Sequence, residues 1–318
     1  MRSVEICAGA GGQALGLEQA GFEHIALIEI DPDACATLKR NRPNWNVILG
    51  DIKRFSAQKY MGNVDLLSGG VPCPPFSVAG KQLGHDDERD LFPEAIRLVR
   101  ECSPKAIMLE NVRGIFDPKF DVYRNSVINQ LEELGYSCVW KLIQTSHYGV
   151  PQLRPRAILG ALQQKYMMNF TWPLGVLTPP PTVGQLLRDE MASNGWEGAV
   201  EWSYRANDIA PTLVGGSKKH GGADLGPTRA REAWKKLGVD GRGLADKPPE
   251  KGFVGDPKLT VKMAALLQGF PNEWEITGKK TTAYRQVGNA FPPPVAKAVG
   301  SAIYKALATE EPVCIMAM

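Results

Sequence analysis

The sequence predicts an α/β protein in which helices cover both faces of a parallel β-sheet. Short apolar runs alternate with helical patterns through about residue 165, and this alternation is typical of parallel sheets. Apolar residues make up 43% of the 318-residue chain and charged residues 22%, a balance typical of a soluble globular protein with a sizeable core. The length is sufficient for one large domain or two smaller ones.

Each predicted strand is a short apolar run, and helical patterns lie between these runs. The expected strands are Val4–Cys7, Ile25–Ile30, Val47–Leu49, Val64–Leu67, Ala106–Leu109 and Ala157–Leu159. The expected helices span residues 13–20, 33–41, 88–101, 121–134, 259–270 and 288–307. The last helix begins near a run of prolines, which the first turn of a helix tolerates.

The composition changes after about residue 173. Eleven of the 33 glycines lie between Gly198 and Gly255, and the stretch "LVGGSKKHGGADLGPTRAREAWKK" is locally basic. We therefore interpret residues 174–257 as a separate small domain or a large insertion, with residues 1–173 and 258–318 forming the main domain. A flexible surface excursion is the alternative interpretation.

Charge and cysteine content exclude several classes of protein. A net charge of +3 excludes a strongly basic nucleic-acid binder, but not one with a local basic face. The six cysteines form no CxxC pair, so we expect neither a metal site nor disulfides, and the usage is that of a reduced, cytoplasmic protein. The sequence contains no apolar run of about 18 residues, so we expect no membrane span. The N-terminus lacks the apolar region of a signal peptide.

A glycine-rich turn follows the first predicted strand. In "VEICAGAGGQALGLEQAG", Gly9, Gly11 and Ala14 fit the pattern G-x-G-x-x-A, which lets the backbone approach a ligand. Glu29, at the end of the second strand, could accept hydrogen bonds from both ribose hydroxyls, and Asp51 in "GDI" could meet an adenine amino group. The pattern predicts a nucleotide site without distinguishing a nicotinamide dinucleotide from S-adenosylmethionine. A tight turn with no ligand is the alternative.

A single cysteine lies in a stiff bend after the fourth predicted strand. In "GGVPCPPFSVAG", prolines flank Cys73 and glycines frame the segment. Ligands bind at this carboxyl edge of open α/β sheets, and an exposed thiol there is a candidate nucleophile. The prolines would limit the positions of the thiol, which favours a fixed attack geometry. Taken alone, such a cysteine is more often a buried loop residue without chemistry.

Other polar residues are expected at the same edge. The fifth strand ends in "LENV", which contains Glu110, and "PQLRPR" places Arg154 and Arg156 before the sixth strand. A thiolate, a carboxyl group and a guanidinium suit attack on a heteroaromatic ring, because the carboxyl group can bind a ring nitrogen and an exocyclic amine while the guanidinium binds a carbonyl oxygen. Singly, these residues are more typical of surface ion pairs. Their shared place at successive strand ends favours a site.

The order of these motifs resembles that of the DNA (cytosine-5) methyltransferases of bacteria and phages. "ICAGAGG" is similar to the family's first glycine motif and "GGVPCPPFS" to its Pro-Cys motif, and "DLF", "ENV" and "QLRPR" follow in family order. "LLQGFP" and "RQVGNAFPPPVA" resemble the last two motifs. The resemblance covers residues 1–173 and 257–307. It is weak between them, where the family carries its variable target-recognition domain, although "PTL" at 211–213 resembles a short family signature.

The resemblance implies a Rossmann-like S-adenosylmethionine-dependent methyltransferase fold with a small, loop-rich target-recognition domain. It implies that Cys73 attacks carbon 6 of a flipped-out cytosine, after which carbon 5 takes the methyl group and S-adenosylhomocysteine is released. Glu110 would hold the ring nitrogen and amino group, and Arg156 the base carbonyl oxygen. Arg154 would join this catalytic group and, like Ser77, would touch phosphate. Because a free thiol has a pKa of about 8.5, the site must lower that pKa or couple attack to proton movement.

The resemblance also implies the cofactor-binding residues. These are Cys7, Ala8, Gly9, Gly11, Gly12, Glu29, Ile30, Asp51, Ile52, Pro72, Leu91, Asn289 and Ala290. Leu91 would pack on the cofactor, and Asn289 would line both its pocket and the catalytic loop. The chain departs from the family at Cys7, where phenylalanine commonly packs on the adenine, and at Pro74, where glutamine is frequent. The cysteine at position 7 would weaken stacking on the adenine but still allow binding. The proline at position 74 puts in doubt whether the side chain at this position fills the gap left by the flipped base.

Candidate DNA contacts are concentrated in the variable region. They are Ser77, Arg154, Arg205, Thr212, Lys218, Lys219, His220, Arg229 and Arg231. Thr212 would lie beside the flipped base, and a solvated glycine-rich loop is the alternative for the lysines. Which of them read bases depends on groove geometry.

The expected partner is double-stranded DNA, in restriction-modification or epigenetic marking. A cognate restriction endonuclease is a further expected partner that activity would not require, and we expect a monomeric, cytoplasmic enzyme of a bacterium or phage. A nicotinamide-dependent oxidoreductase would explain the glycine turn but not the cysteine with "ENV" and "RPR". A catalytically silent DNA-binding module would not need Cys73, Glu110 and Arg156. A tRNA substrate keeps the same chemistry, but the sizeable variable region favours duplex DNA.

Overall fold

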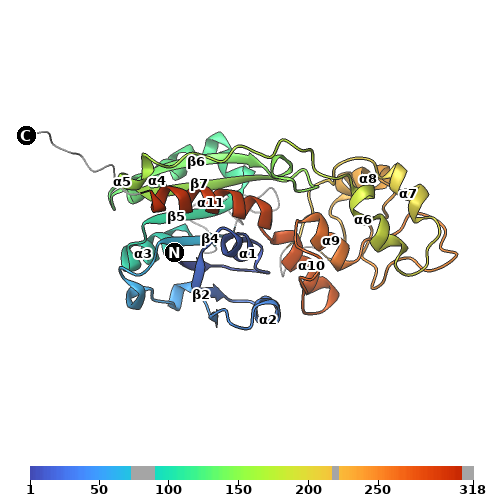
Figure 1. Ribbon diagram of the computed structural model, residues 1–318, viewed down its shortest axis with the longest axis horizontal. Helices are drawn as coiled ribbons and strands as arrows, with labels where there is room; N and C mark the ends of the chain where they lie inside the picture. The colour runs from blue at the N-terminus through green and yellow to red at the C-terminus, as the bar shows by residue number, and fades with distance from the viewer. Residues whose placement is uncertain (73–89, 217–221, 310–318) are drawn as a thin grey trace, which may run out of the picture.

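The computed structural model describes residues 1–72, 90–216 and 222–309, which form two lobes joined through α9 and α10 (Figure 1). Within these residues the larger lobe contains a seven-stranded sheet with the order β3-β2-β1-β4-β5-β7-β6. The strands are β1 (Arg2–Ile6), β2 (Glu23–Glu29), β3 (Val47–Leu49), β4 (Leu66–Gly70), β5 (Ala106–Val112), β6 (Tyr136–Gln144) and β7 (Pro155–Gln163).

Helices alternate with strands as far as β5, except that two short 3-10 helices, Ile52–Arg54 and Gln58–Tyr60, lie between β3 and β4. Those of the larger lobe are α1 (Gly12–Gln19), α2 (Pro32–Asn41), α3 (Phe92–Cys102), α4 (Asp121–Glu132), α5 (Gln164–Met167) and α11 (Pro293–Ala308). The remainder are α6 (Val183–Ala192), α7 (Ala199–Arg205), α8 (Thr228–Lys236), α9 (Val261–Leu267) and α10 (Lys280–Asn289). No helix in the described part of the chain is long and apolar enough to cross a membrane.

The direction of the strands confirms the predicted sheet in part. Strands β1 to β5 are parallel to one another, but β7 runs antiparallel to both β5 and β6. The prediction of a wholly parallel sheet is therefore wrong for β7, the last of the predicted strands. It also missed β6, whose outer position at the sheet edge leaves polar and apolar side chains half-exposed, so that no apolar run marks it in the sequence.

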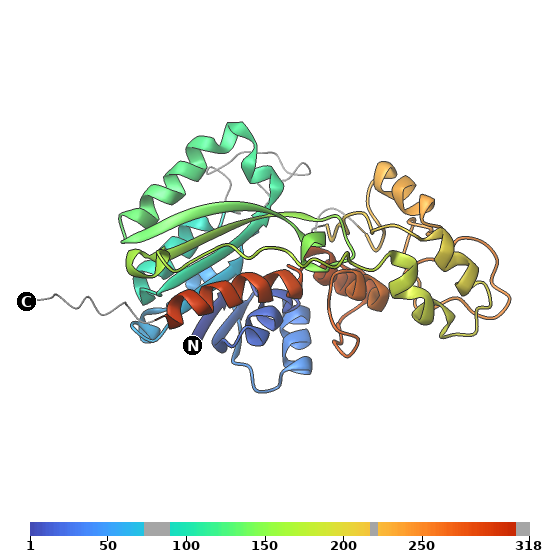
Figure 2. The ribbon, with the colours of Figure 1, turned by 45° about the horizontal axis from the view of Figure 1, so that its top comes forward.

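Alternation along the central strands supplies two separate cores. In β4, Leu66 packs with α1 and α11, whereas Leu67 packs with α3 and α4. In β5, Ile107 packs on the side of α3 and α4, and Met108 packs on the side of α1 and α11. Successive side chains of a strand point to opposite faces of the sheet. Figure 2 shows α4 and α11 on opposite sides of the sheet. This confirms the prediction that helices cover both faces.

Several boundaries differ from the predicted ones. The predicted helix 259–270 is limited to α9, and the predicted helix 288–307 begins only at Pro293, because the separate helix α10 ends at Asn289. Of the predicted helix 88–101, residues 88 and 89 lie outside the described residues, and α3 starts at Phe92. Strand β5 continues to Val112, so that Glu110 lies within the strand rather than after it.

The smaller lobe contains a buried core that extends to Ala10 and Leu15 of the larger lobe. Val183 of α6, Trp202 of α7 and Trp234 of α8 are buried together, in one cluster with Met263 of α9 and Tyr284 of α10. Residues 206–227 and 237–260 contain no helix among their described positions, in line with the predicted loop content. The interpretation as a surface excursion does not fit, because α6, α7 and α8 pack here around buried tryptophans. Where a functional domain begins and ends stays a prediction.

Candidate active site

The glycine turn after β1 leaves open space at one position and is tightly packed at two others. Gly9 has φ +54°, and a Cβ added there would meet no atom within 4 Å. A Cβ on Gly11 would lie 2.6 Å from a methyl of Leu38, and one on Gly12 would lie 2.2 Å from the carbonyl oxygen of Phe291. Gly9 therefore leaves room for a ligand to approach the backbone, whereas Gly11 and Gly12 allow the turn to pack on its neighbours.

Glu29 fixes this turn to the end of β2. One carboxylate oxygen accepts a hydrogen bond of 2.7 Å from the backbone N–H of Gly9, and the other accepts one of 2.8 Å from Asp31. A carboxylate offers about four acceptor positions, so Glu29 can also accept a hydrogen bond from a ribose hydroxyl. Burial raises the pKa of Glu29, and the backbone N–H groups partly oppose this rise. Glu29, the residue predicted to bind the ribose, is thus joined to the glycine turn by a hydrogen bond.

The neighbouring predicted cofactor residues lie around the same opening. Cys7 has φ +52°, and burial, reinforced by the Glu29 and Asp51 carboxylates, raises the pKa of its thiol. Cys7 therefore stays protonated at neutral pH. Ile30 is 62% exposed at the end of β2, while Asp51 accepts a 3.0 Å hydrogen bond from the N–H of Lys53. Ile30 thus offers an exposed apolar surface at the edge where the site was predicted.

A buried carboxylate–guanidinium pair lies at this edge. Glu110 Oε1 is 2.8 Å from Arg156 Nε, and the two side chains are only 9% and 11% exposed. Gly70 of β4 is registered with Glu110, and a Cβ there would lie 3.4 Å from Glu110 Oε2. Burial raises the pKa of Glu110, against the opposing charges of Arg156 and Arg154. The pair confirms that the fold brings Glu110 and Arg156 together, and it leaves Glu110 Oε2 beside the end of β4.

Arg154 does not lie in this group at the surface. Its side chain is fully buried, and its guanidinium donates to the carbonyl oxygens of Leu213 at 2.7 Å, Gly288 at 2.7 Å and Ala290 at 3.2 Å. The prediction that Arg154 touches phosphate or the reacting base is therefore wrong for this structure. The physical reason is that these carbonyls already hold the guanidinium inside the protein.

The remaining cofactor candidates lie in different surroundings. Leu91 is half-buried immediately before α3, and Pro72 is exposed after β4. Asn289 is exposed at the end of α10, and its amide donates to the carbonyl of Gly216 at 3.2 Å. Ala290 is buried. Cys73, Pro74, Ser77, Lys218, Lys219 and His220 lie outside the described residues.

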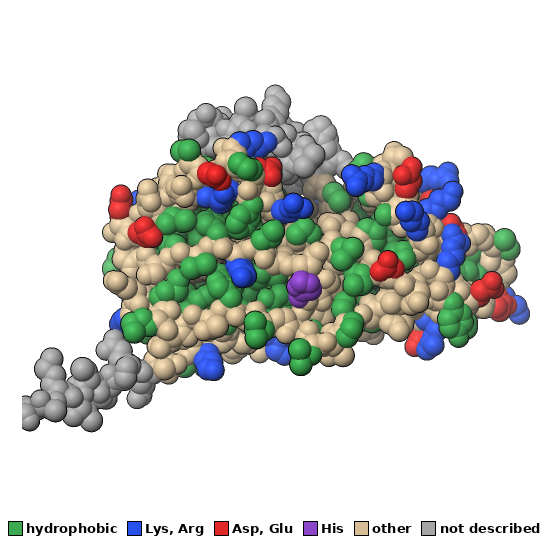
Figure 3. Space-filling view, turned by 90° about the horizontal axis from the view of Figure 1, so that it is seen from above, with side chains coloured by type: hydrophobic (Ala, Val, Ile, Leu, Met, Phe, Trp, Pro, Cys, Tyr) green, Lys and Arg blue, Asp and Glu red, His purple; other side chains and the backbone are tan. Residues whose placement is uncertain are grey.

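Among the predicted DNA-contact residues, Arg205 and Thr212 form hydrogen bonds within the protein, whereas Arg229 and Arg231 lie on α8. Arg205 is paired with Asp256 at 2.7 Å and donates to the carbonyl of Lys235, so it braces the smaller lobe. The hydroxyl of Thr212 donates to the carbonyl of Leu153. Arg229 is exposed on α8, with Arg231 half-buried beside it. In Figure 3 basic side chains gather on the smaller lobe.

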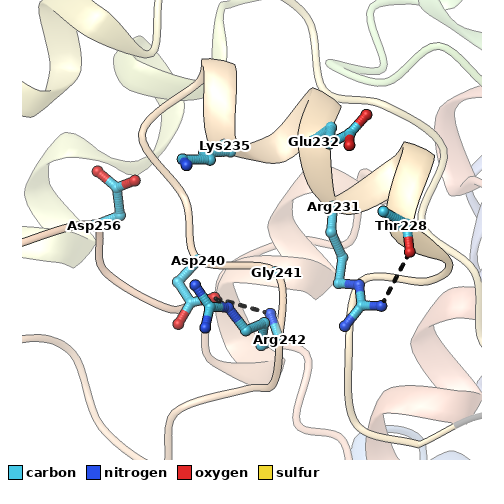
Figure 4. A pocket seen from close by; sticks show the side chains of 8 residues that line it. All are labelled: Thr228, Arg231, Glu232, Lys235, Asp240, Gly241, Arg242 and Asp256. Atoms are coloured by element: carbon cyan, nitrogen blue, oxygen red, sulfur yellow. Dashed lines mark hydrogen bonds and ion pairs between the residues drawn. The ribbon is translucent and has the colours of Figure 1, made fainter.

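A pocket of about 410 Å³ lies on this lobe beside α8. Figure 4 shows Arg231 and Lys235 on the helix and Arg242 on the loop opposite. Their charges are offset by the acidic side chains Glu232, Asp240 and Asp256. Of the residues that line the pocket, only Arg231 was predicted from the sequence.

Sequence reasoning also missed two buried glutamines. Gln152 and Gln268 are fully buried, and their side chains are joined by a hydrogen bond of 2.6 Å. Gln152 lies within the motif "QLRPR" and Gln268 within "LLQGFP". In "LLQGFP" the polar residue inside an otherwise apolar motif was the available signal, whereas "QLRPR" contains no such signal for Gln152.

The fold and the site define a Rossmann-like methyltransferase: a largely parallel sheet with a glycine turn and acidic ribose candidate at one end and a buried carboxylate–guanidinium pair beside it. The chain belongs to the family of C-5 cytosine-specific DNA methylases, whose family model matches residues 1–305. It is a DNA (cytosine-5) methyltransferase by this membership.

Two relatives are similar to nearly the whole chain. Type II methyltransferase M.NgoMIV of Neisseria gonorrhoeae is 57% identical over 311 residues, covering 97% of this chain and 98% of the relative. Type II methyltransferase M.NaeI of Lentzea aerocolonigenes is 57% identical over 312 residues, covering 96% of this chain and 75% of the relative.

Solved structures show the same fold at lower identity. A protein described as a DNA modification methyltransferase of an Escherichia coli prophage has a TM-score of 0.68 at 22% identity, covering 96% of this chain and 99% of that one. A Spodoptera frugiperda DNMT2 mutant has a TM-score of 0.65 at 19% identity, covering 95% and 99%. These likenesses confirm the predicted fold class.

Proposed function

We propose that this methyltransferase modifies a cytosine extruded from a specific duplex sequence, through a covalent bond between Cys73 and carbon 6. The observation that supports it is the buried pair of Glu110 and Arg156 at the sheet edge. Extrusion is required because the target carbon is inaccessible within the stack, and it costs about a few kcal/mol that new contacts must offset. A carboxyl group and a guanidinium held side by side present complementary donors and acceptors to the edge of such a base.

Each catalytic residue has one task in this proposal. The Cys73 thiolate forms the sulfur–carbon 6 bond, and the electron pair displaced from the ring makes carbon 5 nucleophilic. Glu110, whose pKa burial raises, supplies a proton at the ring nitrogen while Arg156 holds the carbonyl oxygen. After methylation, a water molecule takes the proton from carbon 5, the electron pair of that bond restores the double bond between carbons 5 and 6, and the thiolate leaves carbon 6. The ring nitrogen returns its proton to the Glu110 carboxylate.

The cofactor in this proposal is S-adenosyl-L-methionine, which supplies an electrophilic methyl group and becomes S-adenosyl-L-homocysteine. The open backbone at Gly9 and the acceptor positions of Glu29 fit a ribose-bearing ligand. Ile30 would cover one face of the adenine and Asp51 would meet its amino group. The half-buried, neutral thiol of Cys7 would line the same pocket without taking part in the chemistry.

We infer that residues 174–257 form the target-recognition region. The basic residues on α8, Arg229 and Arg231, would contact the DNA backbone, with Thr212 near the extruded base. The relatives at 57% identity carry Type II methyltransferase names, which supports a role in restriction-modification beside a cognate endonuclease. We propose that the enzyme acts as a monomer.

Base-resolution methylation mapping of DNA from cells that express the protein tests this function. We expect 5-methylcytosine at one position of one recurring sequence, and none when Cys73→Ala replaces the wild type. An unmethylated genome with a folded wild-type protein would overturn the proposal, and methylation confined to tRNA would replace DNA by RNA as substrate.

Replacement of Cys73 by alanine separates binding from chemistry. Because alanine removes only the nucleophile, we expect loss of methyl transfer with duplex binding retained within a few-fold. A duplex with 5-fluorocytosine at the mapped position should form a stable adduct with the wild type and none with Cys73→Ala, as read by denaturing electrophoresis. Cys7→Ala is the matched control. Because the Cys7 thiol stays protonated and is not the nucleophile, we expect the Cys7→Ala protein still to form the adduct through Cys73. Near-normal turnover by Cys73→Ala would contradict the assignment.

A further inference from the structure

Arg154 lies where the two lobes meet, two residues before Arg156. Its guanidinium is fully buried, and the carbonyls that it contacts among the described residues come from two segments far apart in the sequence. Leu213 belongs to the segment 210–216 between α7 and α8, whereas Gly288 lies in the last turn of α10 and Ala290 directly follows that helix. One side chain therefore fixes the distance between these segments.

Two buried glutamines extend this connection. Gln152 Oε1 accepts a 2.9 Å hydrogen bond from the N–H of Leu213, and its amide donates to Gln268 Oε1 at 2.6 Å. Gln268 in turn donates to the carbonyl of Ala290. Leu213 and Ala290 are therefore connected twice, once through Arg154 and once through the two glutamines.

The backbones of the two segments are also in direct contact. A Cβ on Gly288 would lie 2.4 Å from the backbone nitrogen of Gly215, and one on Gly215 would lie 2.6 Å from Asn289 Oδ1. Asn289 donates to Gly216 on the same side. Because there is no space between them, a shift of either segment must move the other or break the hydrogen bonds of the buried guanidinium.

A guanidinium suits this junction better than a neutral side chain. Its planar fork carries several donors in fixed directions, so it can satisfy carbonyls from two segments together. A buried cation that loses its partners is strongly unfavourable. An arrangement that satisfies all three carbonyls is therefore favoured over one in which the segments have moved apart.

We propose that Arg154 is a positioning residue that couples cofactor binding to DNA binding. The proposal rests on the proposed function, in which Asn289 and Ala290 line the cofactor pocket and Thr212 contacts DNA. Occupation of the pocket holds the turn 288–290, Arg154 transmits that position to segment 210–216, and Thr212 is then placed for the duplex. Reciprocally, bound DNA raises the affinity for the cofactor by the same factor.

The test measures this factor. The dissociation constant of S-adenosyl-L-homocysteine is determined by titration calorimetry with and without a duplex that contains the mapped target. For the wild type we expect the duplex to tighten binding within the range of about 5- to 150-fold that such couplings span. In Arg154→Lys and Arg154→Gln we expect the factor to fall below about twofold, while each ligand alone binds within about threefold of wild type.

Arg124→Lys is the matched control. Arg124 also donates to backbone carbonyls, those of Ile115 and Asp117, but these lie in one short stretch of the larger lobe. Its replacement should leave the coupling factor unchanged. A wild-type factor of one, or an unchanged factor in the Arg154 variants, would overturn the proposal without affecting the methylation map on which the function is judged.

A wild-type measurement covers the case in which the Arg154 variants do not fold. Addition of S-adenosyl-L-homocysteine without DNA should slow amide hydrogen exchange in residues 210–216, including the Leu213 N–H. Gln268→Met, which removes the second connection, should reduce that protection. No protection of this segment in the wild type would contradict the coupling.

Discussion

Glu5 is a buried carboxyl group behind the glycine turn. It lies in the middle of β1, only 1% exposed, and is registered with Ser68 of β4. Burial raises the pKa of Glu5 well above the usual range of a glutamate, and Ser68 and the backbone of Ala14 oppose this rise only in part. The native protein therefore favours a protonated Glu5, next to the turn that holds the predicted cofactor site.

This raised pKa predicts a dependence of stability on pH. The raised pKa of Glu5 contributes most to the free energy of unfolding below the pKa of an unfolded glutamate. This contribution is lost as the pH rises through the higher folded pKa. Glu5→Gln cannot ionise, so its free energy of unfolding should fall less than that of the wild type between pH 5 and pH 8, by on the order of 1 kcal/mol. Urea denaturation at several pH values measures the difference. The exposed Glu23→Gln is the control and should keep the wild-type slope; equal slopes for all three proteins would contradict the prediction.

Helices α1 and α11 are in unusually close contact. A Cβ on Gly16 of α1 would lie 2.4 Å from the carbonyl oxygen of Pro293 and 2.5 Å from the Cβ of Ala296. Glycine is an unfavourable residue within a helix, but here its missing side chain allows the backbones to approach. The contact links the N-terminal glycine turn to the last helix of the chain.

Gly16→Ala should destabilise the protein despite the better helix propensity of alanine. The added methyl group meets backbone atoms that cannot move alone, and such overpacking costs about 1–3 kcal/mol. We expect a lower Tm in differential scanning calorimetry, by several degrees. Gly50→Ala has open space for its Cβ and should melt like the wild type. A Gly16→Ala protein as stable as Gly50→Ala would show that the helices can separate at little cost.

In the proposed function the two lobes divide the binding tasks between them. The sheet edge holds Glu110 and Arg156, whereas exposed basic side chains lie on α8 of the smaller lobe (Figure 3). Lysine and arginine side chains that neutralise phosphates release counterions, so each of them contributes to the salt dependence of binding.

Arg229→Ala should therefore weaken duplex binding and reduce the salt dependence. For each phosphate that is no longer neutralised, the slope of log K against log salt changes by about 1, and the weakening should be similar for target and non-target sequences. Fluorescence anisotropy between low and moderate salt measures both quantities. Arg205→Ala, which breaks the pair with Asp256, should instead lower the Tm and leave the slope unchanged. A salt-dependence slope of Arg229→Ala equal to that of the wild type would contradict the prediction that α8 contacts DNA.

The sequence was informative wherever local pattern controls structure. Strand β3 was predicted at its observed bounds, and the glycine turn with Glu29 was placed correctly because both depend on residues close in the chain. Strand β6 was missed because an edge strand needs no apolar run. Arg154 was misplaced because two arginines two residues apart look alike in a motif, although one faces Glu110 and the other faces carbonyls from the second lobe.

Motif order and residue chemistry were enough to predict the α/β fold, the cofactor end of the sheet and the membership of the DNA methylase family. These features are local, or repeat in a set order along the chain. The pairing of Glu110 with Arg156, the burial of Arg154 and the shared core of the two lobes were decided only by the tertiary structure. Each depends on backbone segments separated by tens to hundreds of residues, and their contact follows from packing that no short stretch of sequence contains.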